Sequence, residues 1–471
     1  MPDNNRNKPV LIIGLAILFF ILLSLIPGGI KIGPFELKPV DLFIDIKPDS
    51  LLTALPTELQ NSVEEKNESI NSFKLTAAGF FNLDLLKDKS SAEAETNLDA
   101  APPAFEKLSG NVSHMNSFFR ALKNAGNSQV RIAHYGDSEI EGDLITADFR
   151  QYLQEKFGGT GAGFLSITSQ DIAFRTSTKH TFSNNWNTAS VFSGSIRDVE
   201  IGIDGSVSIP QGRAWVKYET TGRFKNLRSF NTARVFYNNA KPNAKIYYSF
   251  DGGREIPVEL KTGSAVNEIV LKADGEVKSF RFSAEDKSAN FYGVSLESGN
   301  GVYVDNFPLR GNTGVSIRDF SGRILKDFNK LMDYDLIILS FGLNVASSNL
   351  SDYTWYEKEM IKAVNLLKTS FPQASILIVS VGDKGIKKGS SFVTDPNIPK
   401  LVAAQRNIAV KSGVAFWNLF EAMGGENSIA KWVNAKPPLA FKDYTHVNLP
   451  GAKKIADMMA DAILDAYKNF K

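Results

Sequence analysis

Hydrophobic positions follow different patterns along the chain, and each pattern predicts a different structure. A nearly continuous apolar run covers residues 10–26. From about residue 105, apolar residues recur first at helical spacing and then in a short buried run at 130–135. Between about 170 and 300 the runs are short and alternating, with turns rich in Gly, Asn and Asp. These changes divide the chain before any motif is considered.

Alternating strands and helices are predicted in the segments 105–170 and 301–471. The expected strands and helices are at 130–135, 335–340, 353–370, 375–381, 399–412, 415–419 and 450–469. Strand–helix alternation of this kind is typical of a parallel sheet covered by helices on both faces. We therefore predict one α/β domain of flavodoxin type, assembled from both segments. The stretch 171–300 is predicted to be an all-β, jelly-roll-like sandwich inserted into it.

The N-terminal segment predicts a membrane anchor. The apolar run is about 17 residues long, which is the lower limit for crossing a bilayer. Arg6 and Lys8 precede it against a single Asp3, so the N-terminus is expected in the cytoplasm. A cleavable signal peptide is the rival interpretation. We predict residues 1–28 as the cytoplasmic terminus and inner-membrane anchor, 29–104 as a tether, and the remainder as periplasmic.

Composition excludes several classes of protein. Of the 471 residues, 53 are Lys or Arg and 51 are Asp or Glu, and this balance argues against a nucleic-acid partner. Cysteine is absent, which excludes disulfides, thiolate metal sites and a cysteine nucleophile. There are only four histidines, which makes a site of several histidines improbable, so we expect no metal and no cofactor.

Ser138 is the first candidate for chemistry, because it lies in GDSEIEGD directly after the strand predicted at 130–135. Catalytic groups in open α/β sheets gather at the carboxyl ends of strands. The backbone N–H of Ser138 can also face a developing anion. A serine that merely caps the following helix is an equally good explanation of this motif taken alone.

Asp443 and His446 form the second candidate, just before the last predicted helix. An Asp three residues before a His can fix the ring tautomer, and the imidazole can then accept a hydroxyl proton. A surface histidine is the simpler alternative. The scarcity of histidine favours the catalytic interpretation, since the other three, His114, His134 and His180, lack such a partner and are expected to be structural.

Asn344 and Gly314 are candidate donors to an oxyanion. Asn344 ends FGLN after the strand predicted at 335–340, and Gly314 lies in RGNTGVS, where a backbone N–H is unobstructed by a side chain. Both residues are also common in ordinary turns. Gly311 competes with Gly314 for the same role.

Taken together, Ser, Gly, Asn and Asp-x-x-His in this order resemble the SGNH (GDSL-type) hydrolase family over residues 105–170 and 301–471. The order GDSEIEGD, FGGTGAGF, a β insertion, YGVSLESGNGVYVDNFPLRGNTG and a late DYTH is similar to the peptidoglycan O-acetylesterase branch, which carries a carbohydrate-binding-like insertion. The resemblance implies Ser138 as nucleophile, His446 as general base and Asp443 as its orienting partner. It implies an oxyanion hole formed by Ser138, Gly314 and Asn344.

Two positions depart from the family pattern: Glu139 replaces a Leu, and Val345 replaces a common acidic residue. We expect Glu139 and Glu141 to be solvated, although their charge would repel an anionic substrate if they faced it. In the β insertion, aromatic residues are expected to fill the core rather than to stack on sugars. These residues are Trp186, Trp215, Tyr247 and Tyr248.

The expected function is removal of O-acetyl groups from an envelope polysaccharide such as peptidoglycan. An O-acetyltransferase with the same triad and a membrane-bound acyltransferase partner is the first alternative, because the acyl-enzyme can pass to a sugar hydroxyl instead of water. A polysaccharide-binding protein without catalysis is the second. Retention of the complete set of Ser, Asn, Asp and His argues against that last possibility.

Overall fold

The computed structural model describes residues 30–32, 35–37, 105–191, 199–346, 350 and 352–470. Residues 1–97 and 98–471 form two compact units, each described by itself. In the first, β1 (Ile30–Ile32) and β2 (Phe35–Leu37) pair as an antiparallel hairpin. The predicted anchor at 10–26 and most of the tether lie outside the described residues. Within the part of the chain that is described, no helix is long and apolar enough to cross a membrane.

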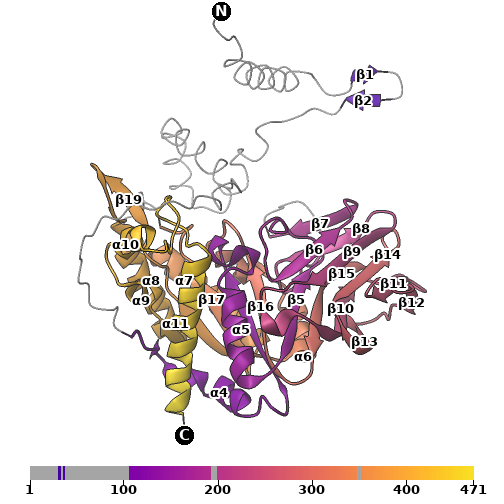
Figure 1. Cartoon of the computed structure of the whole chain (residues 1–471), viewed down its shortest axis with the longest axis horizontal. Coiled ribbons are helices and arrows are strands. Elements are labelled where there is room, and N and C mark those ends of the chain that lie inside the picture. The colour runs from indigo at the N-terminus through magenta and orange to yellow at the C-terminus, as the bar shows by residue number, and fades with distance from the viewer. Residues whose placement is uncertain are drawn as a thin grey trace, which may run out of the picture. The chain divides into compact units, whose positions relative to one another are not determined.

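A six-stranded sheet forms the centre of the second unit (Figure 1). Five strands are parallel and the short edge strand β3 is antiparallel. In sheet order the strands are β16 (Gly301–Pro308), β4 (Gln129–Gly136), β17 (Tyr334–Ser340), β18 (Ser375–Val379), β21 (Ala415–Trp417) and β3 (Ser109–Gly110). The parallel α/β arrangement confirms the predicted fold class in its coarse form.

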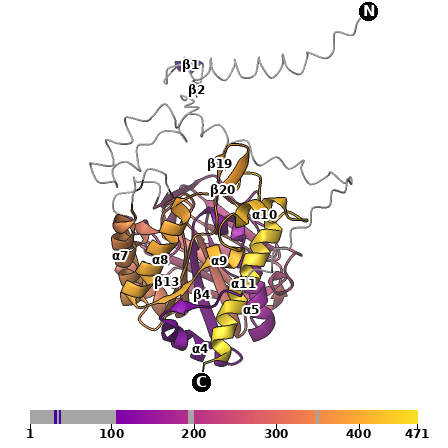
Figure 2. The same cartoon turned by 90° about the vertical axis from the view of Figure 1, so that its left-hand side faces the viewer.

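Helices cover both faces of this sheet, as Figure 2 shows from the side. Along β4, Val130 and Ile132 enter one buried apolar cluster while Ala133 and Tyr135 enter the other, because successive side chains of a strand point to opposite faces. The first cluster is completed by α4 (Asn116–Lys123), α5 (Thr146–Phe157), α9 (Leu419–Met423), α10 (Ser428–Asn434) and α11 (Leu449–Lys468). The second is completed by α6 (Gly322–Met332), α7 (Thr354–Ser370) and α8 (Asn397–Ser412). Short 3-10 helices are η4 (Val112–Met115), η5 (Ser138–Asp143), η6 (Lys225–Leu227) and η7 (Val315–Asp319).

The part of the chain that runs from β5 to β15 forms two antiparallel sheets, and these pack face to face as a sandwich. One sheet contains β13 (Asn267–Val277), β10 (Phe230–Asn238), β15 (Asn290–Ser298), β8 (Ser206–Pro210) and β7 (Trp186–Ser190), with β5 (Thr160–Ser166) also paired to β15. The other contains β12 (Ile256–Glu259), β11 (Lys245–Phe250), β14 (Ser279–Ala284), β9 (Ala214–Thr220) and β6 (Thr178–Phe182). Strand β5 lies within the predicted α/β segment 105–170, but it pairs with β15 of the sandwich.

The sandwich aromatics separate into two groups. Trp186 and Tyr248 pack in or against the sandwich core. Trp215 and Tyr247 lie outside that core. The guanidinium of Arg281 lies over the Trp215 ring, and that of Arg213 lies over the Tyr247 ring. The expectation of core filling therefore holds for the first pair and is wrong for the second, because alternation along β9 and β11 turns those rings to the outer face.

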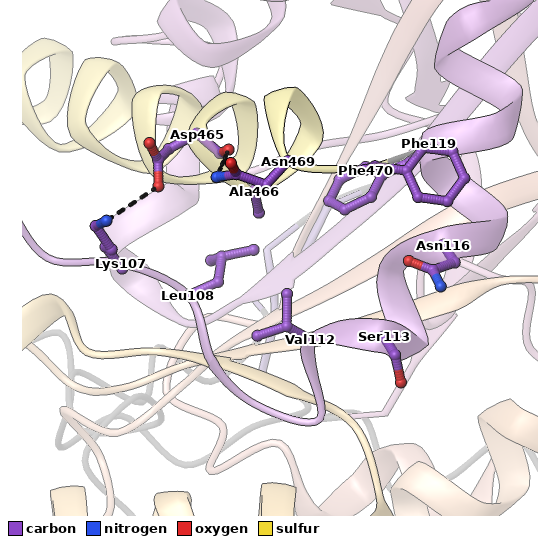
Figure 3. A pocket seen from close by; sticks show the side chains of 10 residues that line it. All are labelled: Lys107, Leu108, Val112, Ser113, Asn116, Phe119, Asp465, Ala466, Asn469 and Phe470. Atoms are coloured by element: carbon purple, nitrogen blue, oxygen red, sulfur yellow. Dashed lines mark hydrogen bonds and ion pairs between the residues drawn. The ribbon is translucent and has the colours of Figure 1, made fainter.

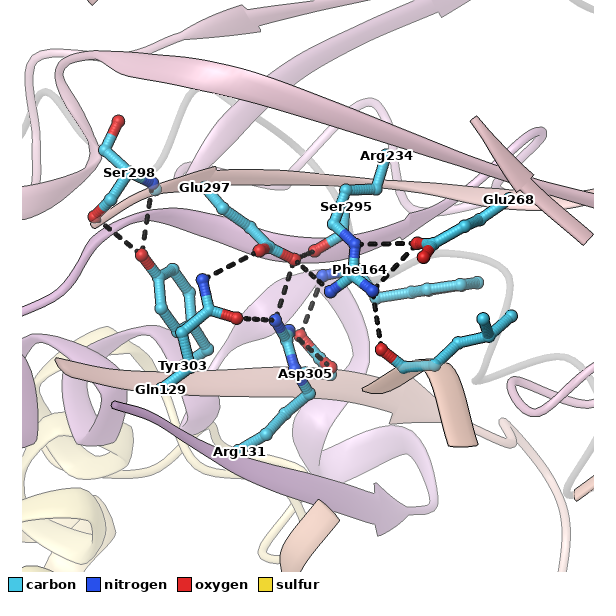
Figure 4. A network of polar contacts seen from close by, with 12 residues as sticks. Gln129, Arg131, Phe164, Arg234, Glu268, Ser295, Glu297, Ser298, Tyr303 and Asp305 are labelled. Carbon is cyan, nitrogen blue, oxygen red and sulfur yellow. Dashed lines mark hydrogen bonds and ion pairs between the residues drawn. The ribbon is translucent and has the colours of Figure 1, made fainter. Parts of the chain in front are cut away.

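A buried ionic network joins the sandwich to the central sheet (Figure 4). Arg131 of β4 pairs with Glu297 of β15 at 2.7 Å and with Asp305 of β16 at 3.4 Å, and these three side chains are almost completely buried. Asp305 also accepts hydrogen bonds from the Phe164 N–H at 2.7 Å and from the Tyr334 hydroxyl at 2.6 Å. Since every charge has a partner, the network fixes the sandwich to the sheet.

A small hairpin projects at the carboxyl end of the central sheet. It consists of β19 (Gly385–Lys388) and β20 (Ser391–Thr394), and it stands out at the edge of the molecule in Figures 1 and 2. Its two strands follow β18 and precede α8.

Candidate active site

Ser138 lies at the turn from β4 into η5, and its neighbours hold that turn tightly. A side chain at Gly136 would approach Ile140 and the Ser340 carbonyl at 2.9 Å, so only glycine fits there. The buried Asp137 carboxylate accepts the N–H of Glu139 at 3.1 Å, and those of Gly342 and Leu343 at 3.1 and 3.2 Å. Asp137 thus ties the turn at Ser138 to the loop after β17. This role of Asp137 was not among the predictions, although Asp is a usual cap at the start of a helix.

The structure brings Ser138, His446 and Asp443 together across more than 300 residues of sequence. The Ser138 Oγ lies 3.2 Å from His446 Nε2, and His446 Nδ1 lies 2.7 Å from Asp443 Oδ2. The other Asp443 oxygen accepts the backbone N–H groups of Thr445 and His446 at 3.0 and 3.1 Å. A carboxylate at Nδ1 leaves Nε2 free to accept the serine proton, which is the arrangement that activates a serine hydroxyl.

The electrostatics of this chain of contacts favour a basic imidazole. The hydrogen bond with Asp443 raises the pKa of His446, against the effect of partial burial, and the charges of Asp443, Glu139 and Asp137 add to the rise. Burial opposes ionisation of Asp443, but hydrogen bonds from the His446 ring and backbone hold its pKa below the usual value. The side chain of His446 remains 43 % exposed, so a substrate can reach it.

Beneath Ser138, a fully buried polar network braces the strand ends. Thr146 Oγ1 donates to Asn306 Oδ1 at 2.9 Å and therefore accepts from His134 Nδ1, also at 2.9 Å. His134 Nε2 then accepts from the Ser340 hydroxyl at 3.1 Å. Burial lowers the pKa of His134 to about 3, so the ring stays neutral. This places His134 in a structural role, as its position within the strand predicts.

Asn344 and the two glycines contribute unequally to an anion site. One Asn344 amide N–H donates to the Asn312 carbonyl at 3.2 Å, which leaves the second N–H for a ligand. The buried Gly314 N–H donates to Asn312 Oδ1 at 2.7 Å, so it is already occupied. Gly314 therefore stays a predicted donor whose N–H must exchange the Asn312 side chain for a ligand. Among the described residues, the N–H of the exposed Gly311 has no such partner, and neither has that of Ser138.

Glu139 and Glu141 are not solvated as expected. Glu139 is 8 % exposed, and no hydrogen-bond partner of its carboxyl occurs among the described residues. Burial and the neighbouring charge of Asp137 raise the pKa of Glu139 to about 8, which His446 partly opposes. Glu141 lies 3.4 Å from the guanidinium of Arg310. The turn from β4 into η5 carries both side chains inward, a consequence of tertiary packing that their polarity does not signal.

A shallow pocket of about 490 Å³ lies elsewhere, between the segment around η4 and the end of α11 (Figure 3). It is lined by Lys107, Leu108, Asp465, Phe470 and their neighbours. His446 precedes the first residue of α11, whereas this pocket touches its last turn, and a helix of 20 residues spans about 30 Å. The pocket is therefore remote from Ser138.

No protein-family model and no curated protein sequence matches this chain. Among solved structures, a peptidoglycan O-acetylesterase is similar with a TM-score of 0.64 and 20% identity, covering 77% of this chain and 99% of that chain. A family two carbohydrate esterase from Cellvibrio japonicus covers 61% of this chain and 98% of its own, with 10% identity and a TM-score of 0.23. The salicylyl-acyltransferase SsfX3 covers 60% and 98%, with 12% identity and a TM-score of 0.27.

The first of these similarities extends over the α/β segments and the sandwich together, because it covers 77% of the chain. The resemblance to SGNH-type hydrolases is confirmed at the level of the fold. Within this fold, the contacts of Ser138, His446 and Asp443 form an arrangement that can activate a serine hydroxyl.

Proposed function

We propose that this protein is a serine esterase that removes O-acetyl groups from an envelope polysaccharide such as peptidoglycan. The observation that carries the proposal is the hydrogen-bonded series from Ser138 through His446 to Asp443. The fold similarity to a peptidoglycan O-acetylesterase supports the choice of acyl group and polymer. The exposed position of the site suits an ester on the surface of a polymer rather than a buried small molecule.

In the proposed reaction, His446 Nε2 takes the proton of Ser138 as the oxygen attacks the ester carbonyl. The N–H groups of Ser138 and of Gly314, or of its alternative Gly311, together with the free N–H of Asn344, stabilise the tetrahedral oxyanion. His446 then returns the proton to the departing sugar hydroxyl, which leaves an acetyl-serine. Water, deprotonated by His446, releases acetate and restores Ser138. Asp443 keeps its charge and holds the ring throughout.

The proposal also places the enzyme at the inner membrane with its catalytic domain in the periplasm. The apolar run at residues 10–26 and the basic residues before it support this location. Extraction of the full-length protein from membranes by detergent but not by alkaline carbonate would support an integral anchor. Release by carbonate would contradict it.

Acetate release tests the enzymatic proposal directly. The fragment beginning at residue 98 and its Ser138→Ala variant are incubated with O-acetylated peptidoglycan, with and without an unacetylated glycan acceptor. We expect free acetate from the wild type only, because the hydroxyl that contacts the base His446 is that of Ser138. Acetate transferred to the acceptor would indicate an O-acetyltransferase, and equal release by Ser138→Ala would refute the mechanism. Binding of the polymer with no release would indicate a binding protein.

A further inference from the structure

The hairpin of β19 and β20 is fastened to the loop that carries Asp443 and His446. The Gly385 N–H donates to the Tyr444 carbonyl at 2.7 Å, and the rings of Phe392 and Tyr444 stack with centroids 3.6 Å apart and planes 5° from parallel. A side chain at Gly385 would meet the Tyr444 Cβ at 2.9 Å. The hairpin therefore lies against the loop that positions the catalytic base, two residues from His446.

The base of the hairpin is also fixed from below. The Thr394 hydroxyl donates to the buried Asp383 carboxylate at 2.8 Å. Thr394 Oγ1 in turn accepts the Asn427 N–H at 2.6 Å. Asp383 additionally accepts the Ile429 N–H of α10 at 2.8 Å. These contacts make the hairpin a fixed wall at the edge of the site.

The charge on this wall is of one sign. Residues 384–394, KGIKKGSSFVT, contain three lysines and no acidic residue, although acidic and basic residues nearly balance over the whole chain. Lys387 and Lys388 are exposed, as are Lys442 and the 49 % exposed Phe441 on the adjoining loop. Within the described residues, none of these lysines forms an ion pair. The basic wall is thus unneutralised and open to a ligand.

We propose that the hairpin is a recognition surface for a glycan strand that carries carboxylates, and that it selects acidic polymers as substrates of the proposed esterase. This inference rests on the proposed function. The lysines attract the carboxylates, while Phe441 and the edges of the Phe392–Tyr444 stack offer apolar contact to sugar rings. A strand whose ester lies at Ser138 would continue along the hairpin because the stack joins the hairpin to the catalytic loop.

The test compares Lys387→Glu/Lys388→Glu with a control of equal charge change, Lys245→Glu/Lys326→Glu, which alters two exposed lysines on β11 and α6. The substrates are O-acetylated peptidoglycan, acetylated xylan as a neutral polymer, and p-nitrophenyl acetate. We expect the hairpin variant to lose about tenfold more kcat/KM on peptidoglycan than on the other two substrates. Added NaCl should reduce the peptidoglycan preference of the wild type and not that of the hairpin variant.

Equal behaviour of the hairpin variant and the control on peptidoglycan would overturn the proposal. A parallel loss on all three substrates would also overturn it, since the hairpin would then act only by positioning Tyr444. Binding of the wild type, but not of the hairpin variant, to phosphatidylglycerol vesicles with unchanged polymer kinetics would assign the surface to a membrane instead. Refutation of the proposed esterase function is distinguishable from refutation of the hairpin proposal. It would appear as p-nitrophenyl acetate hydrolysis that is unchanged by Ser138→Ala.

Discussion

Strand β4 carries two polar clusters, one near each end, and they differ in how their charges are satisfied. Near its beginning, Arg131 pairs with Glu297 and Asp305 in a site where all three side chains are at most 3 % exposed. After its end, the His446 and Asp443 side chains remain 43 % and 31 % exposed, and the carboxyl of the buried Glu139 has no hydrogen-bond partner among the described residues. The first, closed cluster pairs its charged side chains with one another away from solvent, whereas the second, open cluster leaves side chains accessible to a substrate.

This difference separates a structural cluster from a chemical one. A buried charge without a partner is costly, so a cluster that only holds elements together neutralises each charge. A catalytic site must leave acceptors and donors for a substrate, and therefore tolerates exposed or unpartnered groups. On this criterion, the proposed chemistry belongs to the carboxyl end of β4. Substitutions beyond that end should mainly lower activity, whereas substitutions near the beginning of β4 should mainly lower stability.

The largest effect on activity is expected from Asp443→Asn. The amide cannot hold His446 Nδ1 protonated as the carboxylate does, so kcat should fall by about 10³- to 10⁴-fold. The pKa of His446 should fall as well, because its hydrogen bond to Asp443 is the main cause of the rise. Activity needs the neutral ring, so the acidic limb of the pH profile should move to lower pH.

Steady-state kinetics with p-nitrophenyl acetate between pH 5 and 9 measure both effects. Asp457→Asn is a suitable control, since this half-buried carboxylate on α11 forms an ion pair with Lys453. An Asp443→Asn enzyme with the kcat of the control would show that Asp443 does not orient the base.

Arg131→Met should instead affect stability. It leaves Glu297 and Asp305 buried without their main cation, and breaking such a pair typically costs about 3–5 kcal/mol. Urea unfolding followed by circular dichroism measures this loss, and the folded variant should retain a kcat close to that of the wild type. Unchanged stability with a large loss of kcat would reverse the assignment of the two ends of β4.

The sequence sufficed for the α/β class and for Ser138, Asp443 and His446 as candidates, because strand periodicity and a scarce histidine with an Asp at short spacing are local signals. It did not separate Gly314 from Gly311, since that depends on whether the Asn312 side chain occupies the Gly314 N–H. Nor did it anticipate the buried position of Glu139. Both depend on how distant loops pack at the sheet edge, which no local pattern records.

Asn344→Ala tests the proposed anion site with a smaller expected effect on activity. Loss of one oxyanion donor typically lowers kcat by about 10²- to 10³-fold. KM should change little, because the oxyanion forms only in the transition state. Asn434→Ala on the surface of α10 is the control. A rise in KM with an unchanged kcat would show that Asn344 binds the ground state of the substrate instead.

The smallest effect concerns Glu139, the unpartnered acid of the open cluster. Its pKa in the folded protein is about 8 against an ordinary value of 4.5, so the folded state holds a proton that the unfolded state releases between these values. The free energy of unfolding should therefore decline as pH rises through this window. Glu139→Gln removes that decline, so the free energy of unfolding of the variant should equal that of the wild type near pH 4.5 and exceed it at pH 8.5.

Urea unfolding of both proteins at pH 4.5, 6.5 and 8.5 measures the difference, with the exposed Glu276→Gln as control. Parallel pH dependence of Glu139→Gln and the wild type would mean that Glu139 is ionised in the folded protein at neutral pH. The carboxylate would then have a cation or a water network as its partner, and the open cluster would resemble the closed one around Arg131.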